Sequence, residues 1–108
     1  MLPTRGLQLR IEDASLRNTN LRGANLQNAS LQRSILDEAD LTAADLRGAD
    51  LAGTSLEDAD LRKANLDGLK WNALRSVKGA NFDGVQNAPS GFLTWALSHG
   101  AIAKSEEP

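Results

Sequence analysis

The chain of 108 residues contains no cysteine, no tyrosine, only three prolines and a single histidine. Without cysteine there is no disulfide, no nucleophilic thiol and no cysteine–histidine zinc cluster. The sequence therefore gives no information on the redox state of the compartment. No apolar run approaches the roughly 20 residues that cross a bilayer, and residues 1–6 lack the apolar stretch of a secretory signal. These absences lead us to expect a soluble, cytoplasmic protein without a membrane partner.

Neither sign of charge dominates the chain. Lysine and arginine number 12 and aspartate and glutamate 14, which gives a net charge of −2. No basic stripe of the kind that follows a phosphate backbone stands out, so we expect no direct binding to nucleic acid. The sequence also has no glycine-rich phosphate-binding loop between a strand and a helix.

What the sequence has in abundance is leucine at a period of five. Every fifth residue from Leu16 to Leu66 is leucine, Ile11 precedes the series and Trp71 follows it. A small residue lies two positions before each of these leucines. A period of five matches neither the 3.6 of an α-helix nor the 2 of a strand, so the chain must turn a corner every five residues to keep all leucines inside. The spacing therefore predicts an all-β solenoid whose short sides stack at about 4.8 Å.

This pattern resembles the pentapeptide-repeat family, whose motif is A(D/N)LXX. The motif is complete at residues 24–28, 39–43, 49–53 and 64–68. The resemblance extends over about residues 9–88 and implies a right-handed quadrilateral β-helix, in which each residue stacks on the one twenty positions further. The departures are a large apolar residue at the small position (Leu9, Leu69), Ile35 at the Asp/Asn position, and Ile11 and Trp71 at the leucine position.

The chain divides into three parts by its register. Residues 1–8 fit the repeat poorly and form a lead-in, residues 9–88 form the β-helix, and residues 89–108 form a helical cap and a polar tail. Within the β-helix, Val77 lies six residues after Trp71, so one extra residue within 72–76 should bulge at a corner. The first coil has only a thin cover, and we expect its open end to contact a second copy or a missing segment.

A short helix is predicted from Gly91 to His99, with Ser90 as N-cap and Gly100 ending it. One helix face should lie over the final coil and carries the side chains at i, i+3, i+4 and i+7 (Phe92, Trp95, Ala96 and His99). The polar tail from residue 101 to 108 should be frayed.

The most uneven charge is expected on the side of the solenoid that contains Leu16, Leu36 and Leu56. Stacking at twenty residues places Asp37 beside Glu57 and Glu38 beside Asp58, with Ile35 and Ser55 exposed next to them and Arg17 as the only opposing charge. Two interpretations remain open. A basic protein surface could neutralise these carboxylates, with Ile35 as an apolar contact, or the charges could simply keep the strand edges soluble. The candidate partner-binding residues are therefore Ile35, Asp37, Glu38, Glu57 and Asp58.

A column filled with leucine leaves no cavity in which catalytic groups could converge, so we expect no enzyme, no catalytic residue, no metal and no cofactor. The sequence instead favours a non-catalytic scaffold or interaction module for an unknown protein. The family resemblance implies an alternative, a DNA mimic that binds gyrase or another topoisomerase, although duplex DNA carries one charge per about 1.7 Å and a net charge of −2 is a poor match. A column that only spaces or dimerises attached domains is a third interpretation.

Overall fold

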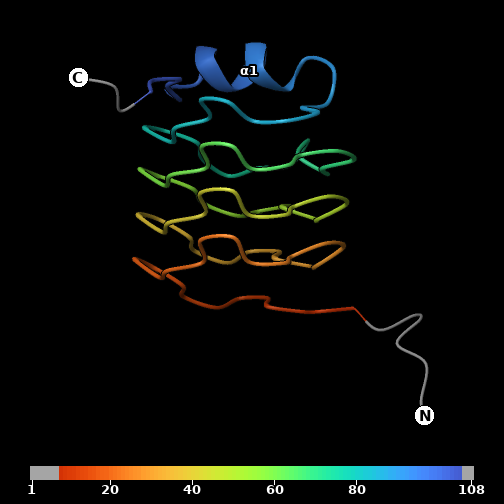
Figure 1. Ribbon diagram of the computed structural model, residues 1–108. Coiled ribbons are helices and arrows are strands. Elements are labelled where there is room, and N and C mark those ends of the chain that lie inside the picture. Colours follow the sequence, from red (N-terminus) through yellow and green to blue (C-terminus); the bar gives the residue numbers. More distant parts are fainter. Residues whose placement is uncertain (1–7, 106–108) are drawn as a thin grey trace.

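The computed structural model describes residues 8–105, in which the chain winds into a stack of coils (Figure 1). Neighbouring coils are joined by isolated parallel β-bridges that recur every five residues along the chain. The bridges form four ladders, and each ladder gives one side of the coil. The ladders run through Arg10, Ser30, Asp50 and Lys70; Ser15, Ile35, Ser55 and Ser76; Asn20, Asp40, Asp60, Asn81 and Ile102; and Asn25, Asp45, Asn65 and Gln86.

Each corner between two sides is a tight turn with a repeated geometry. The N–H of Ala44 donates to the carbonyl of Leu41 at 3.0 Å, and the same bond recurs around the coils. The residue before it adopts a left-handed conformation, with φ of 60° at Ala43 and 70° at Gly48. Glycine reaches this region without a steric penalty, which explains why glycine is common at this repeat position.

The aspartate or asparagine before each leucine stabilises the corner that follows it. The Oδ1 of Asp45, for example, accepts a hydrogen bond from the N–H of Arg47 at 3.2 Å. Such a local bond from a short polar side chain to the nearby backbone is typical of aspartate and asparagine in turns. The same bond is formed by Asn20, Asn25, Asp40, Asp50, Asp60, Asn65 and Asn81.

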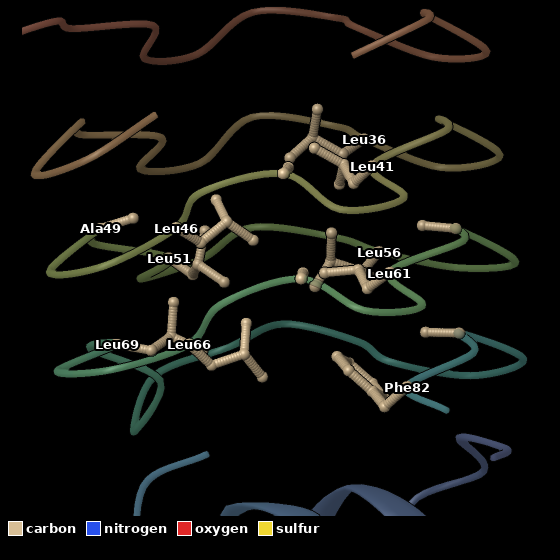
Figure 2. Close-up of a cluster of buried hydrophobic side chains, with 14 of the residues drawn as sticks. Leu36, Leu41, Leu46, Ala49, Leu51, Leu56, Leu61, Leu66, Leu69 and Phe82 are labelled. Carbon is tan, nitrogen blue, oxygen red and sulfur yellow. The ribbon is translucent and has the colours of Figure 1, made fainter. Parts of the chain in front are cut away.

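The leucines fill the centre of the coils, as their period predicts. From Leu31 to Leu66 every repeat leucine is at most 2% exposed. Figure 2 shows Leu36 against Leu41 in one coil and Leu56 against Leu61, in the same arrangement, in the next. The small residues before them, such as Ala49, are also buried and leave room for the chain to turn.

The extra residue predicted after Trp71 is present. Asp50 pairs with Lys70, twenty positions later, whereas Ser55 pairs with Ser76, twenty-one positions later. The later ladders keep the longer spacing, as in the bridge from Asp60 to Asn81. The single insertion between Lys70 and Ser76 thus shifts the fourth coil by one position without breaking its pairing.

The helix α1 (Phe92–Ser98) lies across the last coil (Figure 1). Phe92 is fully buried, and its ring meets those of Phe82 and Trp71 edge-on at centroid distances of 5.1 and 5.3 Å. The N-cap is Gly91, with φ of 83° and no side-chain cap, so the prediction of Ser90 is wrong. A left-handed turn that suits glycine brings the chain onto the column at this point, in place of a capping side chain.

The prediction of a frayed tail is wrong for residues 101–104. The helix ends at Ser98, one residue before the predicted His99, and Gly100 follows the C-cap His99 in a left-handed conformation, as predicted. The chain then rejoins the third ladder, where Ile102 pairs with Asn81. The N–H of Phe82 donates to the carbonyl of Ile102 at 2.9 Å, and the Asn81 amide bonds to both backbone groups of Lys104. These backbone hydrogen bonds hold the segment on the column although its side chains are mostly polar. Residues 106–108 lie outside the described part.

The first coil is open at its N-terminal end. Leu9 is 49% exposed, and Ile11, Leu16 and Leu21 are only half-buried, unlike their counterparts in the second coil. The lead-in at residues 1–7 lies outside the described residues, so contact of this end with a second copy stays a prediction. In the part of the chain that the structure describes, no helix has the length and apolar character to cross a membrane.

Candidate interaction surface

Four carboxylates lie together on the second ladder, which we call the acidic face (Asp37, Glu38, Glu57 and Asp58). The bridge from Ile35 to Ser55 places the two pairs on consecutive coils. The N–H of Glu38 donates to the carbonyl of Glu57 at 2.8 Å, and the N–H of Glu57 donates to the Asp37 carboxylate at 3.0 Å. The structure therefore brings together the carboxylates that the twenty-residue spacing predicts to be neighbours.

Two of these carboxylates bond mainly within the column. Asp37 is 14% exposed and also accepts a hydrogen bond from the Ser55 hydroxyl at 2.6 Å. Glu57 accepts one from the Ser76 hydroxyl at 2.8 Å. Because each has a partner in the coil next to it, Asp37 and Glu57 connect successive coils and have less capacity for an outside ligand.

The other two carboxylates project into solvent from the corners. The Glu38 side chain is 51% exposed and Asp58 is also exposed. Both occupy the left-handed corner position, with φ of 63° and 57°, so the turn itself fixes where each side chain leaves the backbone. Arg17 lies against the N-terminal edge of the face, at 3.5 Å from Asp37 and 3.3 Å from Glu38.

Three expectations for this face are wrong. Ser55 is buried and Ile35 is half-buried rather than exposed, because longer side chains rise around them and leave a hollow of about 150 Å³. Arg17 is also not the only opposing charge. Arg75 lines this hollow together with Asp37 and Glu57, so a second cation lies close to these carboxylates.

A second and larger hollow, which the sequence analysis missed, lies on the third ladder. It measures about 480 Å³, and we call it the mixed-charge hollow. Its lining residues are Arg22, Asp40, Thr42, Asp60, Arg62, Lys63, Asp83 and Ser105. The signal in the sequence is a pair of short residues, Thr42 and Ala43, twenty positions from the longer pair Arg62 and Lys63.

Aspartate and arginine two residues apart form ion pairs at this hollow and on the neighbouring side of the column. Arg62 holds the carboxylate of Asp60 through its Nε at 2.8 Å and its Nη2 at 2.5 Å. These bonds lower the pKa of Asp60, and burial opposes them. The Arg47 guanidinium lowers the pKa of Asp45 in the same way. Both carboxylates therefore stay ionised well into the acidic range.

The described residues offer little for covalent chemistry. Between residues 8 and 105, no three or more histidine or acidic side chains are grouped so that they could hold a metal ion. His99 stacks on Trp95 at a centroid distance of 4.5 Å, and its Nδ1 lies 2.8 Å from the Trp95 carbonyl oxygen.

Residues 10–48 and 39–70 match the family model of pentapeptide repeats, with eight copies. HetL, a pentapeptide repeat protein involved in heterocyst differentiation regulation in the cyanobacterium Nostoc, is 30% identical with a TM-score of 0.55; the match covers 88% of this chain and 36% of HetL. A pentapeptide repeat protein from the thylakoid lumen of Arabidopsis thaliana is 25% identical with a TM-score of 0.53, covering 94% of this chain and 77% of its own. No protein of curated function matches the sequence significantly.

Proposed function

The chain belongs to the pentapeptide-repeat family, and on this premise we propose that it is a non-catalytic interaction module whose acidic face binds a basic surface of a partner protein. We also infer the right-handed coil that is typical of this family. The observation that carries the proposal is the position of Glu38 and Asp58, exposed on consecutive coils and held by left-handed corners. Family membership alone transfers the fold rather than a partner.

The energetics of the acidic face favour a basic partner. Like charges stacked directly opposite each other in neighbouring strands are unfavourable; the bonds of Asp37 and Glu57 relieve the inner pair, and Arg17 relieves Glu38 from one side only. A lysine or arginine from a partner would neutralise Glu38 and Asp58, which already have fixed positions. Such complementarity speeds association and selects the partner more than it raises the affinity.

The DNA-mimic alternative has less support. A mimic of duplex DNA requires a long and continuous negative surface, since the duplex carries one charge per about 1.7 Å of its axis. Here the carboxylates occupy two coils, and Arg17 and Arg75 lie beside them. Because cations flank the carboxylates, this face is complementary in charge to a partner surface with a basic centre and acidic groups around it.

The test is affinity capture from lysate of the source organism with Glu38→Lys and Asp58→Lys variants, each made singly. The matched control is Asp67→Lys, which makes the same charge change at an exposed carboxylate on the side of Leu66. We expect wild type and the control to capture the same protein and both acidic-face variants to lose it, with binding that weakens as salt is raised.

Equal capture by all four proteins would contradict the acidic face as the binding surface. Capture of nothing by the wild type would contradict the interaction module and favour a spacer. The DNA-mimic alternative would be established instead if the wild type captured a topoisomerase and inhibited its supercoiling activity, and if the acidic-face variants no longer captured it.

A further inference from the structure

The mixed-charge hollow has a buried hydroxyl at its floor. Thr42 is 6% exposed, and its Oγ1 makes no hydrogen bond within the structure. A buried polar group without a partner costs about 1–3 kcal/mol, so such groups in folded proteins call for an explanation. Here the hydroxyl belongs to the lining of an open hollow, where a ligand can supply the missing partner.

The shape of the hollow follows from the register of the third ladder. Bridges join Asn20, Asp40, Asp60 and Asn81, so the residues two positions further on also stack on one another. These are Arg22, Thr42, Arg62 and Asp83. Thr42 is the shortest of the four, and the longer side chains on either side wall off the space above it. A volume of about 480 Å³ falls in the range of small-molecule sites.

The charged groups around this hydroxyl differ in how far they are already paired. Asp60 is held by the Arg62 fork. Asp40 accepts only the N–H of Thr42 at 3.0 Å, and Arg22 stays at 4.0 Å from its other oxygen. Among residues 8–105, no ion pair within 4.0 Å involves Lys63 or Asp83. Spare hydrogen-bonding capacity therefore remains on both acidic and basic groups.

The balance of charge selects the ligand class. Three carboxylates line the hollow and would repel a simple anion, while three cationic side chains would repel a simple cation. Asp40 lies on the same coil as Thr42, and Lys63 lies on the next coil. Opposite charges therefore flank Thr42. A molecule that carries both charges satisfies both sides at once.

We propose that the mixed-charge hollow binds a small zwitterion of the amino-acid class. Its ammonium group lies against Asp40 and the Thr42 hydroxyl, and its carboxylate lies toward Lys63. The Thr42 hydroxyl lies near the Asp40 carboxylate without forming a well-aligned hydrogen bond, and together with the Thr42 N–H it lowers the pKa of Asp40, so this carboxylate stays charged for the ammonium group. This site is separate from the acidic face and lies on another side of the column.

The experiment is an NMR titration of the ¹⁵N-labelled full chain at constant ionic strength. The probes are glycine, β-alanine and 4-aminobutyrate, in which the ammonium and carboxylate groups are progressively further apart. Acetate and methylammonium serve as analogues with a single charge. We expect saturable shifts at the amides of Thr42 and Lys63 with at least one zwitterion, and at least fivefold weaker binding of both single-charge analogues.

Two variants assign the effect to the hollow. Thr42→Val removes the hydroxyl at nearly constant size and should weaken binding at least fivefold, whereas the control Thr94→Val, on the exposed surface of α1, should leave it unchanged. Should Thr42→Val fail to fold, Lys63→Gln at an exposed position tests the carboxylate end in its place. The proposal is overturned by no saturable binding of any zwitterion, by equal binding of acetate or methylammonium, or by full affinity in the tested variant.

Discussion

At the scale of single residues, each position of the repeat has one physical task. The leucine fills the column, the preceding aspartate or asparagine bonds to the backbone of the corner, and the second residue after the leucine takes the left-handed turn. This division of tasks explains why the period of five could be interpreted from the sequence with so little ambiguity. The task of a residue also decides how costly its replacement is.

Leu46 illustrates the cost of opening the column. It is 1% exposed and packed on every side, so Leu46→Ala should lower the free energy of unfolding by about 2–5 kcal/mol. The matched control is Leu9→Ala, because Leu9 is 49% exposed at the open end and should cost much less. Urea denaturation measures both, and equal losses would contradict the idea that the closed coils carry the stability.

The pair of Asp60 and Arg62 makes stability depend on pH. Arg62 lowers the pKa of Asp60 from its usual 3.8, so the folded state binds fewer protons than the unfolded state. The contribution is fully present above the unfolded value and is lost as pH falls through the folded pKa. We expect the urea midpoint of the wild type to fall more steeply between about pH 5 and 2 than that of Asp60→Asn. Parallel curves for the two proteins would argue against the linkage.

At the scale of elements, α1 closes the column that the repeats leave open. Its stability comes from aromatic contacts with the last coil, because a helix of seven residues is too short to persist alone. Phe92 touches both Phe82 and Trp71, whereas Trp95 reaches Trp71 at a centroid distance of 5.4 Å and stays half-buried.

Removal of the Phe92 ring should therefore loosen the cap. We expect Phe92→Ala to destabilise the protein by about 3–5 kcal/mol and Trp95→Ala by less. The control is Leu97→Ala on the outer face of α1, where the side chain is 48% exposed and little should change. Thermal unfolding separates the three variants, and an unchanged melting temperature in Phe92→Ala would contradict the capping role.

The ends of these elements show where the sequence falls short as a guide. The aromatic face of α1 was predictable from its spacing, but Gly91 replaces Ser90 as N-cap because the chain approaches the column through a left-handed turn. The pairing of Ile102 with Asn81 was not predictable from a polar segment, since it depends on where α1 releases the chain. The same holds for Arg75, which lies in the segment of the insertion between Lys70 and Ser76 and lines the hollow beside the acidic face.

At the scale of the whole molecule, the coils form a one-dimensional stack in which each contacts mainly its neighbours. Such a stack should unfold from its less protected end. The fold was predictable because the same rule repeats along the chain. The mixed-charge hollow was not, because it arises from side-chain lengths compared across three coils rather than from any local motif.

Amide hydrogen exchange should reveal the open end. The N–H of Asp40 donates to the carbonyl of Thr19 at 3.0 Å, while the N–H of Asn20, one coil earlier, has no partner among residues 8–105. We expect Asn20 to exchange at least tenfold faster than Asp40 in a dilute sample. Protection of Asn20 that rises with protein concentration would establish the predicted contact with a second copy. Equal protection of the two amides at every concentration would contradict an open first coil.

The insertion between Lys70 and Ser76 also limits how such a gene can grow. A duplication of any twenty codons before Lys70 adds one coil and leaves every later bridge in phase, because the pairing there advances by twenty. A duplication that spans the insertion must copy twenty-one codons, or the core residues that follow, Val77 and Phe82, would be displaced by one position toward solvent. Lengthening by unequal recombination is therefore tolerated on the N-terminal side of this boundary, while the last coil and its helix are inherited as one unit.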